Sequence, residues 1–319
     1  MTSIPRTLVD MLFLLRFPLL APVWTILILG WIAGTPDAGV GMSAYGTLFV
    51  NTLGFSLLVA SIYVVNQIQD IESDRINRKL FLLPHGIISI PAAWSLAAVC
   101  AAAGLAISAT QGVWMFALFA AGFAIGILYN LPPAQFKNRA VGGVAANALG
   151  HGVITFLVGW LSAKNGQELA APALVGGLLS SLAPGFANAA VFLATTIPDA
   201  VGDARTGKRT FCVAYGARAA AAAAAAMCAL ALAASFLMES HVWVMAIPAA
   251  ISLFVFVYSA ISAKTESAFY SFKWPVFLLS AFVTLFVPVY GALILFTFFA
   301  SRLYYKYRFG IVYPTFKPK

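Results

Sequence analysis

Long apolar stretches alternate with short polar segments along almost the whole chain. An α-helix of about 20 apolar residues crosses roughly 30 Å of hydrocarbon. The pattern therefore predicts about nine membrane-spanning helices, near residues 11–33, 44–66, 87–109, 112–130, 140–162, 170–197, 211–237, 242–262 and 274–299. Strand-like alternation with a period of two is missing from the sequence, which argues against a barrel. We predict an all-α polytopic membrane protein, with residues 1–319 forming one transmembrane domain and a basic tail beginning at about 301.

Composition supports this setting, since 62% of the residues are hydrophobic and only 9% are charged. The formal net charge is +9. Because no soluble basic segment with interleaved aromatic residues stands apart from the predicted helices, we expect no nucleic-acid partner. Cys100, Cys212 and Cys228 lie inside apolar segments without metal-ligand spacing, as expected for small buried hydrophobic residues.

Positive charge is distributed unequally between the predicted loops. The loops after the second, fourth, sixth and eighth predicted helices carry Arg75, Arg78, Lys79, Lys137, Arg139, Arg205, Lys208, Arg209, Lys264 and Lys273, whereas the alternate loops carry only Lys164. By the positive-inside rule the rich loops and the N-terminus face the cytoplasm, in a bacterial inner membrane. An odd number of helices places the basic C-terminal tail on the opposite side. Either one helix is miscounted or the tail is an exception to the rule.

The segment 66–79, NQIQDIESDRINRK, concentrates charge at the end of the second predicted helix. Asn66, Asp70 and Asp74 are spaced i, i+4, i+8, so on a helix they lie along one side, about one turn apart. Such a column of oxygen ligands is suited to a divalent metal.

A second cluster, PDAVGDARTGKRT, runs from Pro198 to Thr210 and repeats the DxxxD spacing with Asp199 and Asp203. Both clusters end an even-numbered predicted helix, so we expect them to meet on one membrane face. Magnesium prefers carboxylate and phosphate oxygens, and nearby lysine and arginine side chains neutralise phosphate charge. The two clusters together predict a Mg²⁺-chelated diphosphate. One such pair alone is as readily explained by solvated loop charges.

These motifs resemble a known family. The first cluster is similar to the NxxxDxxxD signature of the UbiA superfamily of intramembrane prenyltransferases, and the second to its DxxxDxxxGxxT form, with Gly207 and Thr210 in place. The stretch YNLPPAQFK, from Tyr129 to Lys137, resembles the YSxPPxxxK element of the branch near homogentisate prenyltransferases and chlorophyll synthases. Gln67 stands where many family members have aspartate, and the resulting NQ pair is similar to that branch. The KLFLLPHGIIS run after the first motif departs from the proline-rich sequence common in the family.

The resemblance implies helices around a central cavity and Mg²⁺-dependent transfer of a prenyl group from a polyprenyl diphosphate to a lipophilic or aromatic acceptor within the membrane lipid. The expected metal-binding residues are Asn66, Asp70, Asp74, Asp199 and Asp203, of which the four aspartates are also the expected catalytic residues. Lys137 matches a lysine near the diphosphate, and Arg78 and Lys208 are assigned to the diphosphate by their proximity to the motifs.

Three further polar residues lie in or near predicted helices. Asn147 and His151 are one turn apart in the fifth, where polar side chains are costly and often functional. They are candidates for contact with the acceptor, and an interhelical hydrogen bond is an equal alternative. Arg16 is a candidate for binding an acceptor carboxylate, although we favour its extending to the membrane interface.

Two other functions remain as alternatives. A UbiA-type terpene cyclase uses the same ionisation but returns the allylic cation to its own chain. A transporter or non-catalytic membrane protein predicts polar residues that continue to the far membrane face. The charges in this sequence gather on one side, which favours an enzyme.

Overall fold

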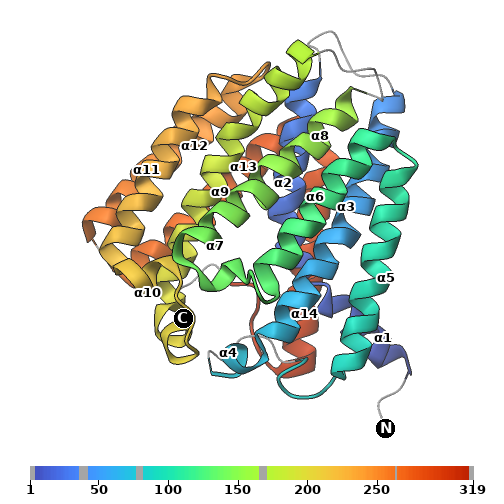
Figure 1. Cartoon of the computed structure of the whole chain (residues 1–319), viewed down its shortest axis with the longest axis vertical. Coiled ribbons are helices and arrows are strands. Elements are labelled where there is room, and N and C mark those ends of the chain that lie inside the picture. Colours follow the sequence, from blue (N-terminus) through green and yellow to red (C-terminus); the bar gives the residue numbers. More distant parts are fainter. Residues whose placement is uncertain (1–3, 36–41, 77–81, 165–170, 263, 316–319) are drawn as a thin grey trace.

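The computed structural model describes residues 4–35, 42–76, 82–164, 171–262 and 264–315. It is a bundle of helices, and the described residues form no named strand (Figure 1). The helices are α1 (Ile4–Leu14), α2 (Phe17–Gly34), α3 (Met42–Gln69), α4 (Ile71–Ile76), α5 (Ile90–Ala109), α6 (Val113–Asn130), η1 (Phe136–Asn138), α7 (Ala140–Asn147), η2 (Ala148–Ile154), α8 (Thr155–Ala163), α9 (Ala171–Arg205), α10 (Phe211–Tyr215), α11 (Ala217–Ser235), α12 (Val242–Ser262), α13 (Thr265–Phe286) and α14 (Pro288–Phe309).

Nine helical stretches in the described part of the chain are long and apolar enough to cross a membrane. They are α2, α3, α5, α6, the continuous stretch from α7 through η2 to α8, α9, α11, α12 and α13. The predicted all-α membrane fold is therefore confirmed. Most predicted boundaries agree within a few residues, but the first and the last predicted helices were wrong.

The first predicted helix, 11–33, is two helices in the structure. The chain breaks at Arg16, whose backbone is left-handed (φ 59°), and α2 begins with Pro18 in its first turn. Proline suits the start of a helix because its missing N–H would have no partner there. The short helix α1 lies at the end of the bundle near the N-terminus, where it contacts α14 (Figure 1).

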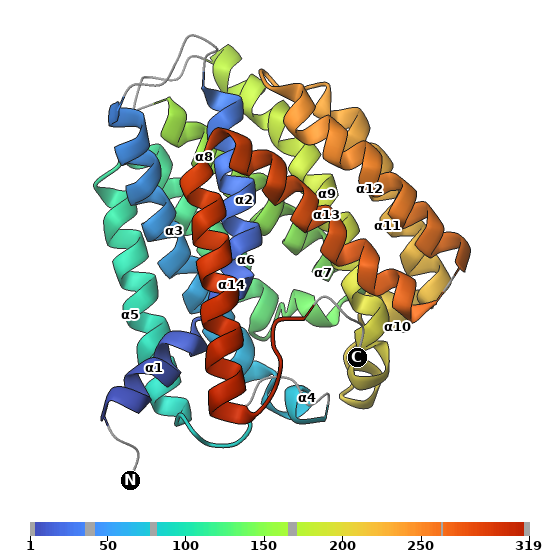
Figure 2. The same ribbon diagram turned by 180° about the vertical axis from the view of Figure 1, so that it is seen from behind.

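The last predicted helix, 274–299, is also divided. α13 ends at Phe286 and α14 starts at Pro288, because proline interrupts the helical hydrogen bonds and begins a new helix. α14 runs back toward the end of the bundle where α1 lies (Figure 2). Arg308, near the end of this extra helix, thus lies beside Asp10 of α1.

Close packing places α2 in the middle of the bundle against α8. A Cβ atom on Gly159 would lie 1.7 Å from the carbonyl oxygen of Leu27, and one on Gly30 would lie 2.0 Å from that of Phe156. Glycine at both positions lets the two backbones touch. The central position of α2 makes it one wall of the large cavity described below.

Candidate active site

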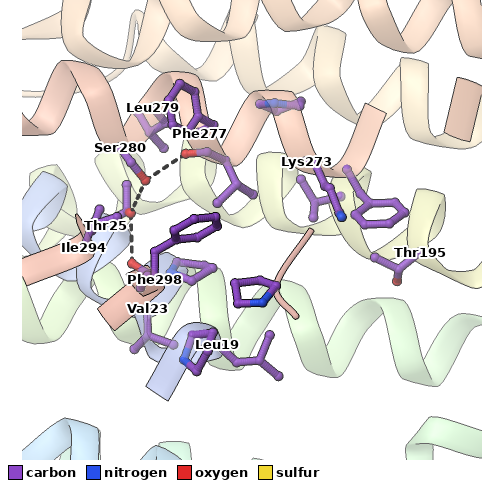
Figure 3. Close-up of a pocket in the computed structure, with 18 of the residues that line it drawn as sticks. Leu19, Val23, Thr25, Thr195, Lys273, Phe277, Leu279, Ser280, Ile294 and Phe298 are labelled. Atoms are coloured by element: carbon purple, nitrogen blue, oxygen red, sulfur yellow. Dashed lines mark hydrogen bonds between the residues drawn. The ribbon is translucent and has the colours of Figure 1, made fainter. Parts of the chain in front are cut away.

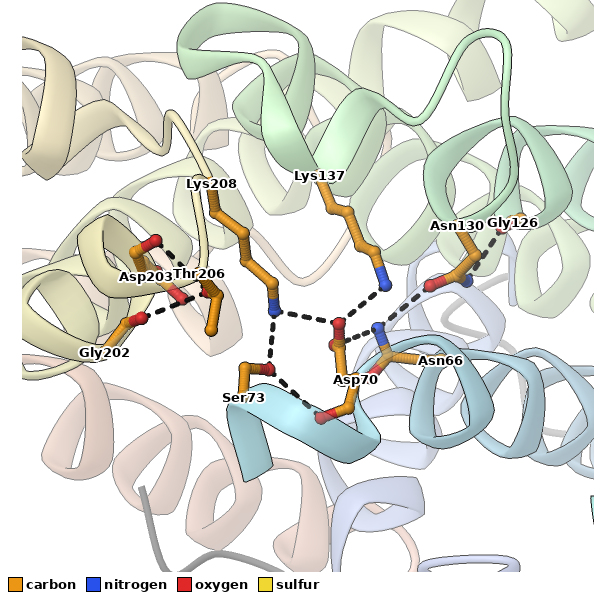
Figure 4. Close-up of polar contacts among 10 residues, drawn as sticks. All are labelled: Asn66, Asp70, Ser73, Gly126, Asn130, Lys137, Gly202, Asp203, Thr206 and Lys208. Atoms are coloured by element: carbon orange, nitrogen blue, oxygen red, sulfur yellow. Dashed lines mark hydrogen bonds and ion pairs between the residues drawn. The ribbon is translucent and has the colours of Figure 1, made fainter. Parts of the chain in front are cut away.

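The carboxylate of Asp70 is the centre of a polar cluster (Figure 4). The ammonium nitrogens of Lys137 and Lys208 each lie 2.8 Å from Asp70 Oδ1. The amide of Asn66 donates to Asp70 Oδ2 over 3.0 Å. The Asp70 side chain is 13% exposed and those of the two lysines 5% and 15%, so these charges interact with little screening by water. These three side chains together carry two positive charges and one negative charge, which suits an anionic ligand.

The environment shifts the ionisation of two of these groups. Burial alone would raise the pKa of Asp70, but the ammonium groups of Lys137 and Lys208 outweigh it, and the pKa lies below its ordinary value. Burial lowers the pKa of Lys137, and the Asp70 carboxylate offsets only part of that effect. Asp70 is therefore held as a carboxylate.

Helical geometry continues through the first motif. The N–H of Asp70 donates to the carbonyl of Asn66 (3.0 Å), and that of Asp74 to the carbonyl of Asp70 (2.8 Å). The one-turn spacing predicted from the sequence is thus present across the junction of α3 and α4. Ser73 adds to the site, since its hydroxyl oxygen lies 2.9 Å from Lys208 Nζ.

The second motif delivers Lys208 through a helix C-cap. Gly207 has φ +74°. The N–H of Gly207 donates to Ala204 O (3.2 Å), and that of Lys208 to Asp203 O (2.9 Å). This pair of bonds is a Schellman motif, in which glycine adopts the left-handed conformation after the last helical turn. The reversal turns Lys208 back toward Asp70.

Lys137 comes from η1, in the loop between α6 and α7. A single parallel bridge joins Arg139 to Arg209. It places the loop of Lys137 beside the loop of Lys208, so two segments about 70 residues apart present their lysines to the same carboxylate. Lys137 and Lys208, both assigned to the diphosphate from the sequence, thus both contact Asp70 in the structure.

A cavity of about 2220 Å³ extends from the acidic motifs into the bundle. Asp74 and Asp199 both line it, and most of its other lining residues are apolar, from α2, α9, α12, α13 and α14 (Figure 3). A smaller cavity of about 150 Å³, between α3, α6 and the α7–η2 stretch, is bordered by Asn66 and Tyr129. The large cavity thus has carboxylates at one place in its wall and mostly apolar side chains elsewhere.

Four residues border both cavities: Arg16, Tyr63, Asn147 and His151. Arg16, expected at the membrane interface, therefore lies in the wall between them. His151 stacks on Tyr63, with ring centroids 5.8 Å apart. Asn147 donates within its own helix to Gly143 O (3.0 Å). His151 lies in the π-helical stretch η2, a local widening that often occurs at functional sites.

The remaining predicted residues also lie near the cluster, with one exception. Asp199 of the second motif lines the large cavity together with Asp74 of the first. Asp203 is largely buried, with 8% of its surface exposed. Arg78 lies outside the described residues.

Sequence reasoning does not single out Asn130. It is fully buried, its amide oxygen accepts a bond from Asn66 (2.9 Å), and its amide nitrogen donates to Gly126 O (2.9 Å). The amide of Asn66 is thereby oriented toward Asp70. The available signal was its position directly after Tyr129 in the YNLPP stretch.

The side-chain oxygens of the two motifs suit Mg²⁺ only when a bound phosphate group supplies further oxygen ligands. Over the described ranges, no three His, Cys, Asp or Glu side chains lie close enough to form a metal site of protein ligands alone. Mg²⁺ commonly takes one or two carboxylates and completes its shell with substrate phosphates and water. Two buried polar atoms on residues close in sequence to the lysines, Thr210 Oγ1 and Asn138 Oδ1, have no hydrogen-bond partner among the residues that the structure describes. Oxygen-rich motifs with unsatisfied polar neighbours fit a metal–diphosphate group.

Comparison with known proteins decides the family. The UbiA prenyltransferase family matches residues 19–281. The chain belongs to the UbiA prenyltransferase family. This confirms the resemblance drawn from the two acidic motifs, and the nine apolar helices together with this family make the chain an integral, multi-pass membrane protein.

Curated relatives of this UbiA family member are distant. The chain is 29% identical over 174 residues to 2-acyl-4-prenylphloroglucinol 6-prenyltransferase of Humulus lupulus, covering 51% of this chain and 41% of that protein. It is 32% identical over 83 residues to homogentisate phytyltransferase of Synechocystis sp., covering 25% of this chain and 27% of that protein. Against digeranylgeranylglyceryl phosphate synthase of Methanoculleus marisnigri it is 29% identical, covering 63% and 70%. The first relatives are thus matched over less than half their length.

Solved structures share the fold. A UbiA homologue from Archaeoglobus fulgidus bound to DMAPP and Mg²⁺ superposes with a TM-score of 0.65 at 22% identity, covering 89% of this chain and 99% of that one. A UbiA homologue from Aeropyrum pernix gives a TM-score of 0.68 at 18% identity, covering 84% and 96%. At these identities the likeness establishes the fold alone.

Proposed function

We propose that this protein transfers a prenyl group from a polyprenyl diphosphate to a lipophilic or aromatic acceptor in a Mg²⁺-dependent reaction. The observation that carries the proposal is the convergence of Lys137 and Lys208 on Asp70, one helical turn before Asp74, which lines a large and mostly apolar cavity. A diphosphate needs cations and oxygen ligands, whereas a prenyl chain needs an apolar chamber. The Archaeoglobus fulgidus homologue, whose structure holds DMAPP and Mg²⁺, supports the same pairing of ligands.

In this proposal the metal is held by oxygens of Asn66, Asp70, Asp74, Asp199 and Asp203. Bound Mg²⁺ supplies Lewis-acid withdrawal of charge from the leaving diphosphate. Lys137 and Lys208 exchange the Asp70 carboxylate for diphosphate oxygens and neutralise their charge. Arg78 is assigned to the same role by its place in the sequence.

The chemistry requires that one bond break and another form. The C1–O bond of the allylic diphosphate breaks, and its electron pair leaves with the diphosphate. The acceptor then gives an electron pair to C1 and releases a proton. Preorganised cations that stabilise the developing negative charge on the diphosphate lower this barrier. The apolar walls of the cavity keep water from capturing the allylic cation.

The acceptor is proposed to lie against Asn147 and His151, because these residues border both cavities next to the acidic motifs. By the charge distribution of the loops, this end of the bundle faces the cytoplasm of a bacterial inner membrane.

The test is incubation of the purified protein with Mg²⁺ and labelled geranylgeranyl diphosphate, with and without homogentisate, hydroxybenzoate, chlorophyllide or lycopene, followed by mass spectrometry of the lipid extract. A product that requires one acceptor supports a transferase and identifies the acceptor class. A cyclised hydrocarbon formed without acceptor would instead indicate a terpene cyclase. If geranyl, farnesyl and geranylgeranyl diphosphates all fail to release diphosphate, the enzymatic proposal is overturned.

A further inference from the structure

α14 lies wholly beyond residues 19–281, which match the family, and yet it forms part of the cavity wall. It packs against α2 and α13 (Figure 2). Its residues divide into two faces. Ile294 and Phe298 line the cavity, whereas Phe296 and Phe299 are 70% and 62% exposed on the outer side. α14 therefore separates the cavity from the exterior of the bundle, where the bilayer lies.

The end of α14 that follows α13 is fixed by hydroxyl groups. The hydroxyl of Tyr290 donates to Ala21 O of α2 (3.1 Å) and contacts Thr25 Oγ1. Thr25 in turn lies 2.8 Å from Ser280 Oγ of α13. Tyr290 is only 3% exposed, so this network ties three helices together inside the bundle.

The other end of α14 is held by charge and by aromatic stacking. Arg308 Nε and Nη2 donate to the two carboxylate oxygens of Asp10 over 3.1 and 3.2 Å, and the hydroxyl of Tyr304 donates to Asp10 over 2.6 Å. The ring of Tyr304 stacks on Phe13, with centroids 3.7 Å apart. Since both ends are anchored, the inner face of α14 is a fixed boundary of the cavity.

The part of the cavity wall next to Phe298 is mostly apolar. Figure 3 shows Phe298 among Leu19 and Val23 of α2 and Ile294 of its own helix. The nearby hydroxyls, those of Thr25 and Ser280, are bonded to each other. A hydrocarbon is the ligand that such a surface favours, because it buries apolar area without leaving polar groups unpaired.

Asp74 and Asp199 line the same cavity as Phe298, so one molecule with an anionic head and an apolar tail can touch both regions. Given the function proposed above, on which this step rests, we propose that Phe298 of α14 bounds the space for the isoprenoid tail and thereby sets the longest prenyl chain that binds well. Phe298 is a specificity-determining residue on a helix that the family match does not include.

The test measures binding, so it does not depend on turnover. The dissociation constants of geranyl, farnesyl and geranylgeranyl thiolodiphosphates are measured with Mg²⁺ for the wild-type protein and for Phe298→Ala, Phe298→Trp and Phe299→Ala. Phe299→Ala is the matched control, because it removes the same ring from the outer face of the same helix. A shortened side chain makes room for part of a further isoprene unit, so Phe298→Ala should favour the longest analogue over the shortest by about fivefold relative to wild type.

Phe298→Trp should shift the ratio of affinities for the longest and the shortest analogue in the opposite direction, and Phe299→Ala should leave that ratio unchanged. The same chain-length profile in all four proteins would overturn the role of Phe298 while leaving the proposed function intact. A uniform loss of affinity in Phe298→Ala, with no change of ratio in either variant of Phe298, would have the same meaning. Binding of no analogue by the wild-type protein would overturn the proposed function, and this inference with it.

Discussion

Lys137 Nζ lies 2.8 Å from Asp70 Oδ1, although the two residues are 67 positions apart in the chain. The pair joins the first acidic motif to the loop after α6, and both side chains are largely withdrawn from water. A buried ion pair is a weak source of stability, because desolvation consumes most of its Coulomb energy. Under the proposed function, the pair keeps a carboxylate for the metal and an ammonium group for the diphosphate in one place.

Asp70→Asn should abolish most turnover while preserving the fold. The amide keeps the size of the side chain but removes the negative charge that we assign to the metal. We expect kcat to fall by at least about 100-fold, as for the loss of one preorganised electrostatic group. Diphosphate release at saturating substrate and Mg²⁺ measures the effect. Glu72→Gln is the control, since Glu72 is exposed and pairs with Arg75 away from the cluster, and its activity should stay near wild type.

Lys137→Ala should raise KM for the prenyl diphosphate by on the order of tenfold, because one charge-assisted contact to a diphosphate oxygen is lost. KM for the acceptor should change little. Lys164→Ala removes the same charge far from the motifs, where Lys164 lies 3.5 Å from Glu239, and should alter neither constant. An effect of Lys137→Ala confined to the acceptor would move this lysine to the other part of the site.

Gly207→Ala should impair the site through the backbone. A Cβ at Gly207 meets open space, so the cost is the left-handed conformation alone, about 1 kcal/mol of the free energy of unfolding. The strained cap should also displace Lys208 and raise KM for the prenyl diphosphate. Gly310→Ala is a matched control, because Gly310 has φ +69° after α14 and likewise meets open space. It should lower thermal stability equally and leave that KM unchanged.

The lowered pKa of Asp70 predicts a pH dependence of stability. A carboxyl whose folded pKa lies below its ordinary 3.8 binds fewer protons in the folded protein, so its contribution is complete above about pH 5. That contribution is lost as the pH falls below 3.8 through the folded pKa. Thermal unfolding of wild type and Asp70→Asn between pH 7 and pH 3 measures it. The difference between their midpoints should shrink toward acid, and a constant difference would contradict the assignment.

The sequence was sufficient for the membrane fold and for the acidic motifs, because both depend on local spacing, whereas Lys137 was assigned to the site through the family resemblance. Asn66, Asp70 and Asp74 follow helical periodicity, and Gly207 was noted only as part of the second motif. The role of Asn130 was not predictable in this way, since its bond to Asn66 joins helices that are distant in sequence. The break at Val287 was missed because Pro288 stands within an apolar run whose hydropathy does not change. Cavity walls likewise depend on packing between distant helices, and spacing along the chain does not reveal them.

The division of the last predicted helix leads to a prediction about topology. Because α14 returns toward α1 and Arg308 pairs with Asp10, residues near position 306 should lie on the same membrane side as the loop of Lys208. In a cysteine-free background with its three native cysteines replaced, Lys306→Cys and Arg205→Cys should react with a membrane-impermeant maleimide only in vesicles that expose the cytoplasmic face. Lys164→Cys should react only in vesicles of the opposite orientation. Labelling of Lys306→Cys together with Lys164→Cys would restore the odd count of crossings and contradict the return of α14. Labelling of Lys306→Cys together with Arg205→Cys would mean that the basic C-terminal segment obeys the positive-inside rule.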